Sequence, residues 1–156
     1  MRDNPTVRQF RAMHLAMFAQ SCGTLAQMAF ANGLMLLYFT ALGYTGAGIM
    51  LAVSLPTITE AAARIPFAHV ADRHGKRRCG KFGIAANVAG LLVLIAAALV
   101  TGPWRNACVL SGGVLYGIGQ SMFVSGWFAL LSPLVPRAFR GRFFGSLRLT
   151  WQLVGI

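Results

Sequence analysis

Four long apolar stretches run through this sequence, and they limit the folds that it can adopt. They cover residues 14–41, 46–70, 82–101 and 107–132, and a fifth stretch, 143–156, is cut off at the last residue. A helix needs about 20 predominantly apolar residues to cross the hydrocarbon core of a bilayer. Because the stretches are continuous and do not alternate apolar with polar residues, helices are favoured over barrel strands. We therefore predict an all-α membrane protein with four complete transmembrane helices and part of a fifth.

The composition indicates that lipid is the solvent for most of this chain. Apolar residues make up 56% of the chain and charged residues 11%, which is too little charge to cover a water-facing surface. The net charge of +11 would suit nucleic acid, but the cations lie between apolar stretches, so we expect no nucleic-acid partner. The three cysteines are far apart and form no C-x-x-C pair, so we expect no disulfide framework, metal site or cofactor.

Positively charged residues are distributed unevenly among the links between the stretches. Eleven Lys and Arg residues lie in the N-terminal segment and in the links after the second and fourth stretches, whereas the other two links carry one. Cytoplasmic loops are enriched in Lys and Arg, so we predict a multi-pass protein of the plasma (inner) membrane with a cytoplasmic N-terminus. The first apolar run continues well past Ala31 and exceeds a signal-peptide core of about 7–15 residues, so we expect it to be retained.

The link between the second and third stretches carries one acidic residue in a basic run. It reads Asp-Arg-His-Gly-Lys-Arg-Arg over residues 72–78. This resembles the signature of the major facilitator superfamily, in which a Gly precedes an Asp-Arg-x-Gly run followed by two basic residues. The leading Gly of the family, four residues before the Asp, is Ala68 here, which is still small enough for close helix approach. The positions that match the signature are Asp72, Arg73, Gly75, Lys76 and Arg77.

The resemblance implies a fold and a function for the chain. It implies that residues 1–156 form a single transmembrane domain, the incomplete N-terminal half of the major facilitator fold. The implied function is secondary active transport of a small-molecule substrate by alternating access, coupled to protons or another ion, with the missing C-terminal half forming the other wall of the site. The alternative is a membrane scaffold or interaction fragment that transports nothing. An enzyme is not expected, because the His and acidic residues are scattered along the chain.

The signature loop has two interpretations. The resemblance implies that it latches the two helical halves on the cytoplasmic side and releases as the protein changes face, with Asp72 as the latching group. The alternative is that the basic residues only hold the loop in the cytoplasm. That alternative explains the cations but not Asp72, which is the one acid in this loop. Gly75 permits a tight turn in either case, since glycine adopts positive φ at little cost.

Two charged residues lie inside the second apolar stretch. Glu60 and Arg64 are four residues apart and therefore share a helix face. A charge at the bilayer centre costs about 2.5 kcal/mol or more, so such residues face a cavity or one another. One hypothesis makes Glu60 a site for a proton or a substrate charge. The other is a structural Glu60–Arg64 ion pair, with Arg64 reaching toward the membrane interface.

Amide side chains lie inside the first and third stretches. Gln20 and Gln27 are seven residues apart and share one face of the first. The first helix lines the central cavity in the family that the chain resembles, so both are candidate substrate contacts. Hydrogen bonding between helices is the alternative for the two. We assign Asn87, in the third stretch, to packing.

An aromatic stripe lies along the fourth stretch. Its members are spaced so that they share one helix face, which would suit either a cavity wall that stacks an organic substrate or a packing surface. The nearby Gly113 and Gly117 form a G-x-x-x-G pair, which allows another helix to approach closely. The stripe consists of Tyr116, Gln120, Phe123 and Trp127, of which we list Tyr116, Gln120 and Trp127 as pathway candidates.

Overall fold

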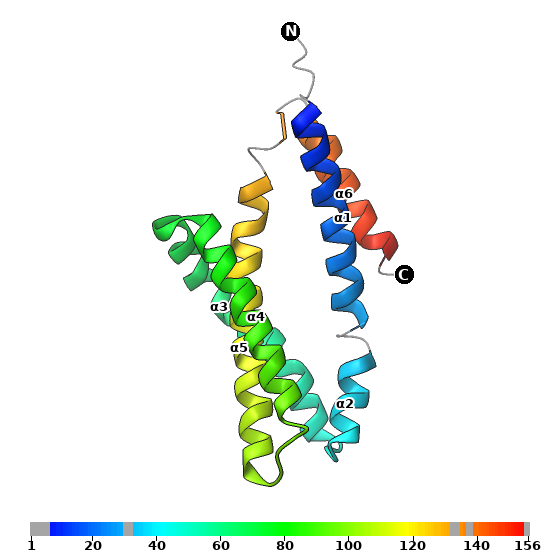
Figure 1. Cartoon of the computed structure of the whole chain (residues 1–156), viewed down its shortest axis with the longest axis vertical. Helices are drawn as coiled ribbons and strands as arrows, with labels where there is room; N and C mark the ends of the chain where they lie inside the picture. The colour runs from blue at the N-terminus through cyan, green and yellow to red at the C-terminus, as the bar shows by residue number, and fades with distance from the viewer. Residues whose placement is uncertain (1–6, 30–32, 132–134, 137–138, 155–156) are drawn as a thin grey trace. The chain divides into compact units, whose positions relative to one another are not determined.

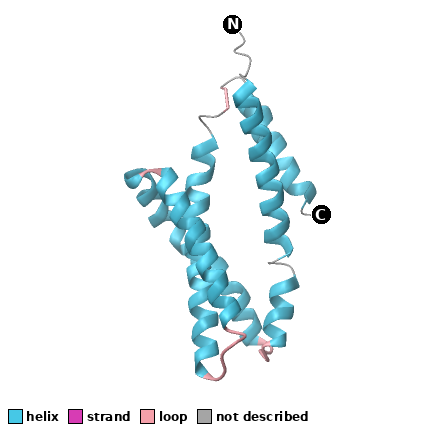
Figure 2. Ribbon diagram, in the orientation of Figure 1, coloured by secondary structure: helices cyan, strands magenta, loops and turns pink. Residues whose placement is uncertain are grey.

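The chain folds into helices joined by short turns (Figures 1 and 2). The computed structural model describes residues 7–29, 33–131, 135–136 and 139–154, and these ranges contain no strand. Parts of the predicted first, fourth and fifth stretches lie outside the described residues. The chain divides into two compact units, which are described separately here: Met1–Leu34 with Ala129–Ile156, and Met35–Phe128.

The first unit contains α1 (Val7–Ala29) and α6 (Arg140–Val154), which lie side by side (Figure 1). One face of α6 is buried through Phe143 and Leu147, which are four residues apart. Leu149 and Leu153 of the same helix are exposed. The helix therefore has a packed side and an apolar side that lipid can cover.

The second unit contains α2 (Met35–Ala41), α3 (Ala47–His74), α4 (Lys76–Ala96) and α5 (Pro103–Leu131), which belongs to this unit as far as Phe128. α3 contacts both α2 and α4. Many large apolar side chains on these helices are exposed. Such a surface suits a chain whose outer face is covered by lipid tails rather than by water.

The helix boundaries differ from the predicted ones at the signature loop. The sequence predicted helices over 46–70 and 82–101, whereas α3 continues to His74 and α4 begins at Lys76. Gly75 alone separates them, with φ 93° and ψ 127°, a conformation that side-chain-bearing residues rarely adopt. Arg and Lys are good helix formers, so the basic run extends the helices instead of forming a loop.

Three helices are long and apolar enough to cross a membrane by length and composition: Ala47–His74, Lys76–Ala96 and Pro103–Trp127. They correspond to the predicted second, third and fourth crossings. The predicted first crossing, 14–41, falls on α1, on residues 30–32, which are not described, and on α2, which has 7 residues. Within the described residues, the structure therefore supports an all-helical membrane protein but does not establish the predicted number of crossings.

α4 and α5 pack closely along a row of glycines. A Cβ atom added at Gly90 would lie 2.6 Å from the backbone nitrogen of Tyr116, and one added at Gly119 would lie 2.6 Å from the backbone nitrogen of Asn87. Any larger residue would force the two backbones apart. The row, which we call the glycine seam, consists of Gly83 and Gly90 on α4 and Gly112 and Gly119 on α5.

A separate glycine brings α5 against α3. A Cβ atom at Gly117 would lie 2.9 Å from Cβ of Thr59 and 3.1 Å from the backbone nitrogen of Glu60. Gly113, the other member of the predicted pair, has ordinary contacts, the nearest at 3.4 Å from a Leu55 methyl carbon. The predicted close approach is therefore present, and Gly117 provides it beside Glu60.

Arg105, the lone basic residue of the predicted outer links, joins the ends of α2 and α4. Its Nη1 donates to the Leu42 carbonyl oxygen at 2.9 Å, and its Nε donates to the Val100 carbonyl oxygen at 3.1 Å. Both carbonyls follow helix ends, where backbone oxygens lack helical partners. In addition, the Tyr38 hydroxyl of α2 donates to the Leu94 carbonyl of α4. These bonds fasten α2, α4 and the start of α5 together.

Candidate functional site

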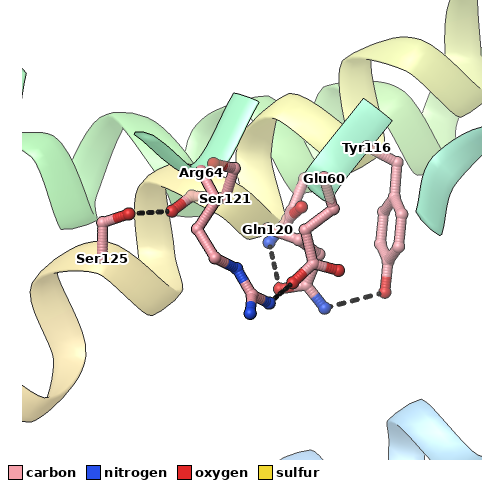
Figure 3. Close-up of polar contacts among 7 residues, drawn as sticks. Glu60, Arg64, Tyr116, Gln120, Ser121 and Ser125 are labelled. Atoms are coloured by element: carbon pink, nitrogen blue, oxygen red, sulfur yellow. Dashed lines mark hydrogen bonds and ion pairs between the residues drawn. The ribbon is translucent and has the colours of Figure 1, made fainter. Parts of the chain in front are cut away.

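The predicted ion pair is formed on α3 (Figure 3). Arg64 Nη2 lies 2.5 Å from Glu60 Oε1, and the side chains are 57% and 20% exposed, respectively. The exposed Ile58 and Ile65 mark the apolar side of the helix. Glu60 follows Ile58 by two residues, or about 200° around the helix, so it points away from that side. Glu60 therefore lies on the face of α3 opposite to these isoleucines, whereas Arg64 lies at the side of the helix, about 100° from Ile65.

α5 supplies two polar groups beside this pair. Gln120 Nε2 donates to the Tyr116 hydroxyl at 3.3 Å, and the Glu60 carboxylate is close enough to Tyr116 to interact with it electrostatically. Figure 3 shows the carboxylate, the amide and the hydroxyl projecting toward the same side of the helices. The structure thus brings Glu60, Arg64, Tyr116 and Gln120 together, although the sequence placed them in two separate stretches.

α4 contributes Asn87, which we assign to packing from its place in the sequence. Asn87 Nδ2 donates to Gln120 Oε1 at 3.3 Å, so both ends of the Gln120 amide are engaged. Asn87 Oδ1 is buried and has no hydrogen-bond partner among the residues that the structure describes. A lone amide in the middle of an apolar span must find a partner, and that signal could have identified Asn87 from the sequence.

The aromatic stripe of α5 lies between its two glycine contacts. Gln120 is one residue from Gly119, which faces α4, and three residues from Gly117, which faces α3. Farther along the stripe, the rings of Phe123 and Trp127 have centroids 5.3 Å apart and planes inclined by 30°. Trp127 Nε1 is buried without a hydrogen-bond partner among the described residues. Its role as pathway or packing residue stays a prediction.

A pair of hydroxyls follows on α5. Ser125 Oγ donates to the Ser121 carbonyl oxygen at 2.7 Å. Ser121 is fully buried, and within the described part of the chain its Oγ has no hydrogen-bond partner. Figure 3 shows the bond between these two serines on α5.

The signature residues surround the α3–α4 turn. Lys76 Nζ lies 3.4 Å from Asp72 Oδ1, and the side chains are 43% and 66% exposed. Arg73 and Arg77 are exposed on either side of Gly75. An ion pair this exposed contributes little to stability, at most about 1 kcal/mol. Asp72 can therefore exchange Lys76 for another partner at little cost.

The two candidate glutamines of α1 belong to the first unit. Gln20 Nε2 donates to Thr24 Oγ1 at 3.5 Å, and the Thr24 hydroxyl donates to the Gln20 carbonyl oxygen at 2.8 Å. Gln27 is exposed. Because the two units are described separately, a role for these side chains as substrate contacts stays a prediction.

The arrangement in the second unit suits exchange of a charge. A carboxylate that is mostly buried holds a guanidinium that is mostly exposed, and a hydroxyl and an amide lie alongside. In a medium of low polarity, a carboxylate is stabilised by a paired cation. A charged solute can therefore bind to either member of the pair only by rearranging the pair.

A comparison with known families agrees with the signature and the helical fold. The family model described as Major Facilitator Superfamily matches residues 7–156, nearly the whole chain. No curated protein and no solved structure matches the chain. The match includes the α3–α4 turn with Asp72 and Gly75, and all six helices described above. The chain therefore belongs to the major facilitator superfamily, whose members are membrane transporters of small solutes.

Proposed function

We propose that the protein carries out secondary active transport of a small solute by alternating access, with coupling to protons or another ion. The observation that carries this proposal is the Glu60–Arg64 pair, held beside the Tyr116 hydroxyl and the Gln120 amide within apolar helices. Charges inside a membrane are costly, and structural stability alone is served better by apolar residues. A pair kept at this position is best explained by a function that uses its charge.

The proposal assigns roles to the individual side chains. Glu60 binds and releases the coupling proton, and Arg64 provides its counter-charge. The polar and aromatic side chains proposed to contact the solute lie on α1 in the first unit and on α5 in the second. Those groups are Gln20, Gln27, Tyr116, Gln120 and Trp127.

The proposal also covers the orientation of the chain in the membrane and the part of the protein that completes the site. The basic residues of the α3–α4 turn support a cytoplasmic location for that turn, and hence a cytoplasmic N-terminus in a plasma (inner) membrane. A site between two helical halves needs a second wall. We propose that a C-terminal half of the transporter supplies this wall, together with the rest of the alternating-access machinery.

Transport by the protein in its full native length tests this proposal. Purified protein is reconstituted into liposomes, and uptake of solute panels is measured with and without an imposed proton gradient. Glu60→Gln should abolish gradient-driven accumulation but keep solute exchange, because a neutral amide mimics the protonated carboxyl. Ser54→Ala is the matched control, since Ser54 is exposed on α3 and its hydroxyl donates to the Met50 carbonyl of the same helix.

The outcomes separate transport from the scaffold alternative. Gradient-driven accumulation that is unchanged in Glu60→Gln would remove Glu60 from the coupling mechanism. A folded, correctly inserted protein that moves no solute of the panel in either direction would instead favour a membrane scaffold or interaction role.

A further inference from the structure

We propose that the solute is a small organic anion whose carboxylate replaces the Glu60 carboxylate at Arg64 when Glu60 takes up a proton. This inference rests on the proposed transport function and names the substrate class and the coupling step of the same site. Its basis is the unequal exposure of the two charges, together with the polar groups that surround them.

The guanidinium is the accessible member of the pair. Arg64 is 57% exposed, whereas Glu60 is 20% exposed. Arg carries five N–H donors, and the one contact recorded for Arg64 within the described residues is between Nη2 and Oε1 of Glu60. Donors therefore remain on the open side of the guanidinium, in the planar arrangement that binds carboxylates.

A cationic solute fits this geometry less well. It would have to reach the less exposed Glu60 and displace Arg64, which is attached to the same helix one turn away. Each member of the pair is tethered to the other, but a proton can neutralise only the carboxylate, because the guanidinium of Arg is not deprotonated in proteins. An anion contacts the exposed guanidinium first and needs only one proton to neutralise the carboxylate that it displaces.

The exchange balances in charge and protons. Before it, Glu60 is ionised and paired with Arg64. After it, Glu60 carries one proton and the solute carboxylate is paired with Arg64. The site is neutral in both states, which keeps the cost of exchange low in a medium of low polarity. Because anion binding and proton binding favour each other, affinity for the anion should rise as the pH falls.

The groups around Glu60 are consistent with this exchange. α5 presents Tyr116 to the carboxylate, and the amides of Gln120 and Asn87 continue into the glycine seam. α4 carries its basic residues within its first six positions, 76–81, well before Asn87, and the only titratable side chain of α2, Tyr38, bonds to Leu94. In the unit that holds the pair, Arg64 is thus the cation that an incoming carboxylate meets beside Glu60.

Calorimetric binding of matched probes to the full-length protein tests the proposal. The anions are pyruvate and benzoate, and benzamide and benzylamine are the neutral and cationic analogues of benzoate. Titration in buffers of different ionisation enthalpy gives the number of protons taken up per ligand. We expect uptake of about one proton with at least one of the two anions, and no binding of the amide or the amine.

Substitutions at Glu60 and Arg64 test whether proton uptake and anion binding depend on this ion pair. Glu60→Gln should bind the anion with no proton uptake and with an affinity independent of pH. Arg64→Gln should weaken binding by about tenfold or more, the typical effect of losing a charged hydrogen bond. Arg64→Lys, which keeps the charge, should retain proton uptake even if binding weakens. Arg78→Gln makes the same change at an exposed position outside the site and should behave as the wild type.

Several results would overturn the inference. One is binding of benzylamine without benzoate, and another is the absence of proton-linked binding by either anion. Anion binding that persists unchanged in Arg64→Gln is a third. If anion binding disappears when the protein is moved from phosphatidylcholine to phosphatidylglycerol nanodiscs, and Arg64→Gln removes that lipid effect, the ligand of Arg64 is a lipid headgroup. Glu60-dependent transport of an uncharged solute would leave the proposed function intact while excluding this substrate class.

Discussion

The turn at Gly75 leaves the Asp72 carboxylate near the end of α3 and the start of α4. Asp72 lies in the last turn of α3, where the negative end of the helix dipole disfavours an acid, and just before the first turn of α4, where the positive end favours one. The exposed contact with Lys76 offsets part of this imbalance. A group held so loosely in its own turn is free to bind elsewhere, as the latch hypothesis requires.

The Asp72→Asn variant tests whether Asp72 acts as the latch or only neutralises the charge of Lys76. We expect substrate binding to be retained and turnover to fall by about tenfold or more, because a charged hydrogen bond that favours one face of the transport cycle is lost. Turnover is measured by uptake into liposomes and binding by calorimetry. Adding Lys76→Gln to this variant should not restore turnover. Wild-type turnover in Asp72→Asn, or full recovery in the double variant, would contradict the latch.

Two of the site residues illustrate what the sequence could predict at this scale. Glu60 and Arg64 are four residues apart on one helix, so helical periodicity alone brought them together. The bond between Asn87 and Gln120 joins two helices, and its formation depends on how far one slides past the other. That register is set by backbone contact at the glycine seam, which could not be inferred from spacing along either helix.

The glycine seam fixes α4 and α5 as a pair. Gly83 and Gly90 are seven residues apart, as are Gly112 and Gly119, so each pair repeats after two helical turns on one face. Helices in lipid gain little from the hydrophobic effect and associate through close packing. The seam therefore provides much of the contact that positions Asn87 against Gln120.

Gly90→Ala tests the seam directly. The added methyl group would lie 2.6 Å from the Tyr116 backbone nitrogen, which cannot rotate away as a side chain could. We expect a loss of about 1–3 kcal/mol in the free energy of unfolding, measured by circular dichroism in detergent. The matched control is Gly145→Ala on α6, where an added Cβ meets nothing within 4 Å. Alanine has a higher helix propensity than glycine, so we expect the free energy of unfolding of this control to rise by about 0.5–1 kcal/mol. Equal stability of the two variants would contradict the seam.

The helices themselves were predicted more reliably than their ends. Continuous apolar stretches are enough to indicate α3, α4 and α5, because lipid requires backbone groups to bond within each segment. The observed helix ends differ from the predicted ones at the basic α3–α4 turn. There, Arg and Lys indicated the membrane boundary, but both residues also favour the helical conformation. The first stretch, 14–41, falls on two helices, one in each unit, and its periodicity gave no indication of this.

At the scale of the whole molecule, the account depends on the chain crossing the membrane in alternating directions. The basic α3–α4 turn and the link before α6 should share the cytoplasmic side, and the link between α4 and α5 should lie on the other. Arg105 is compatible with that outer side, because its guanidinium donates hydrogen bonds to the carbonyl oxygens of Leu42 and Val100. Every assignment of Glu60, Arg64 and Asp72 to a transport cycle requires this arrangement.

Chemical labelling of single cysteines measures this arrangement most directly. The background is the full-length protein with its native cysteines, Cys22, Cys79 and Cys108, replaced by serine. His74→Cys, Arg142→Cys and Thr101→Cys, all at exposed positions, are treated with a membrane-impermeant maleimide in right-side-out and inverted vesicles. We predict that positions 74 and 142 react only from the cytoplasmic side and position 101 only from the opposite side. Labelling of 74 and 142 from opposite faces would contradict the account.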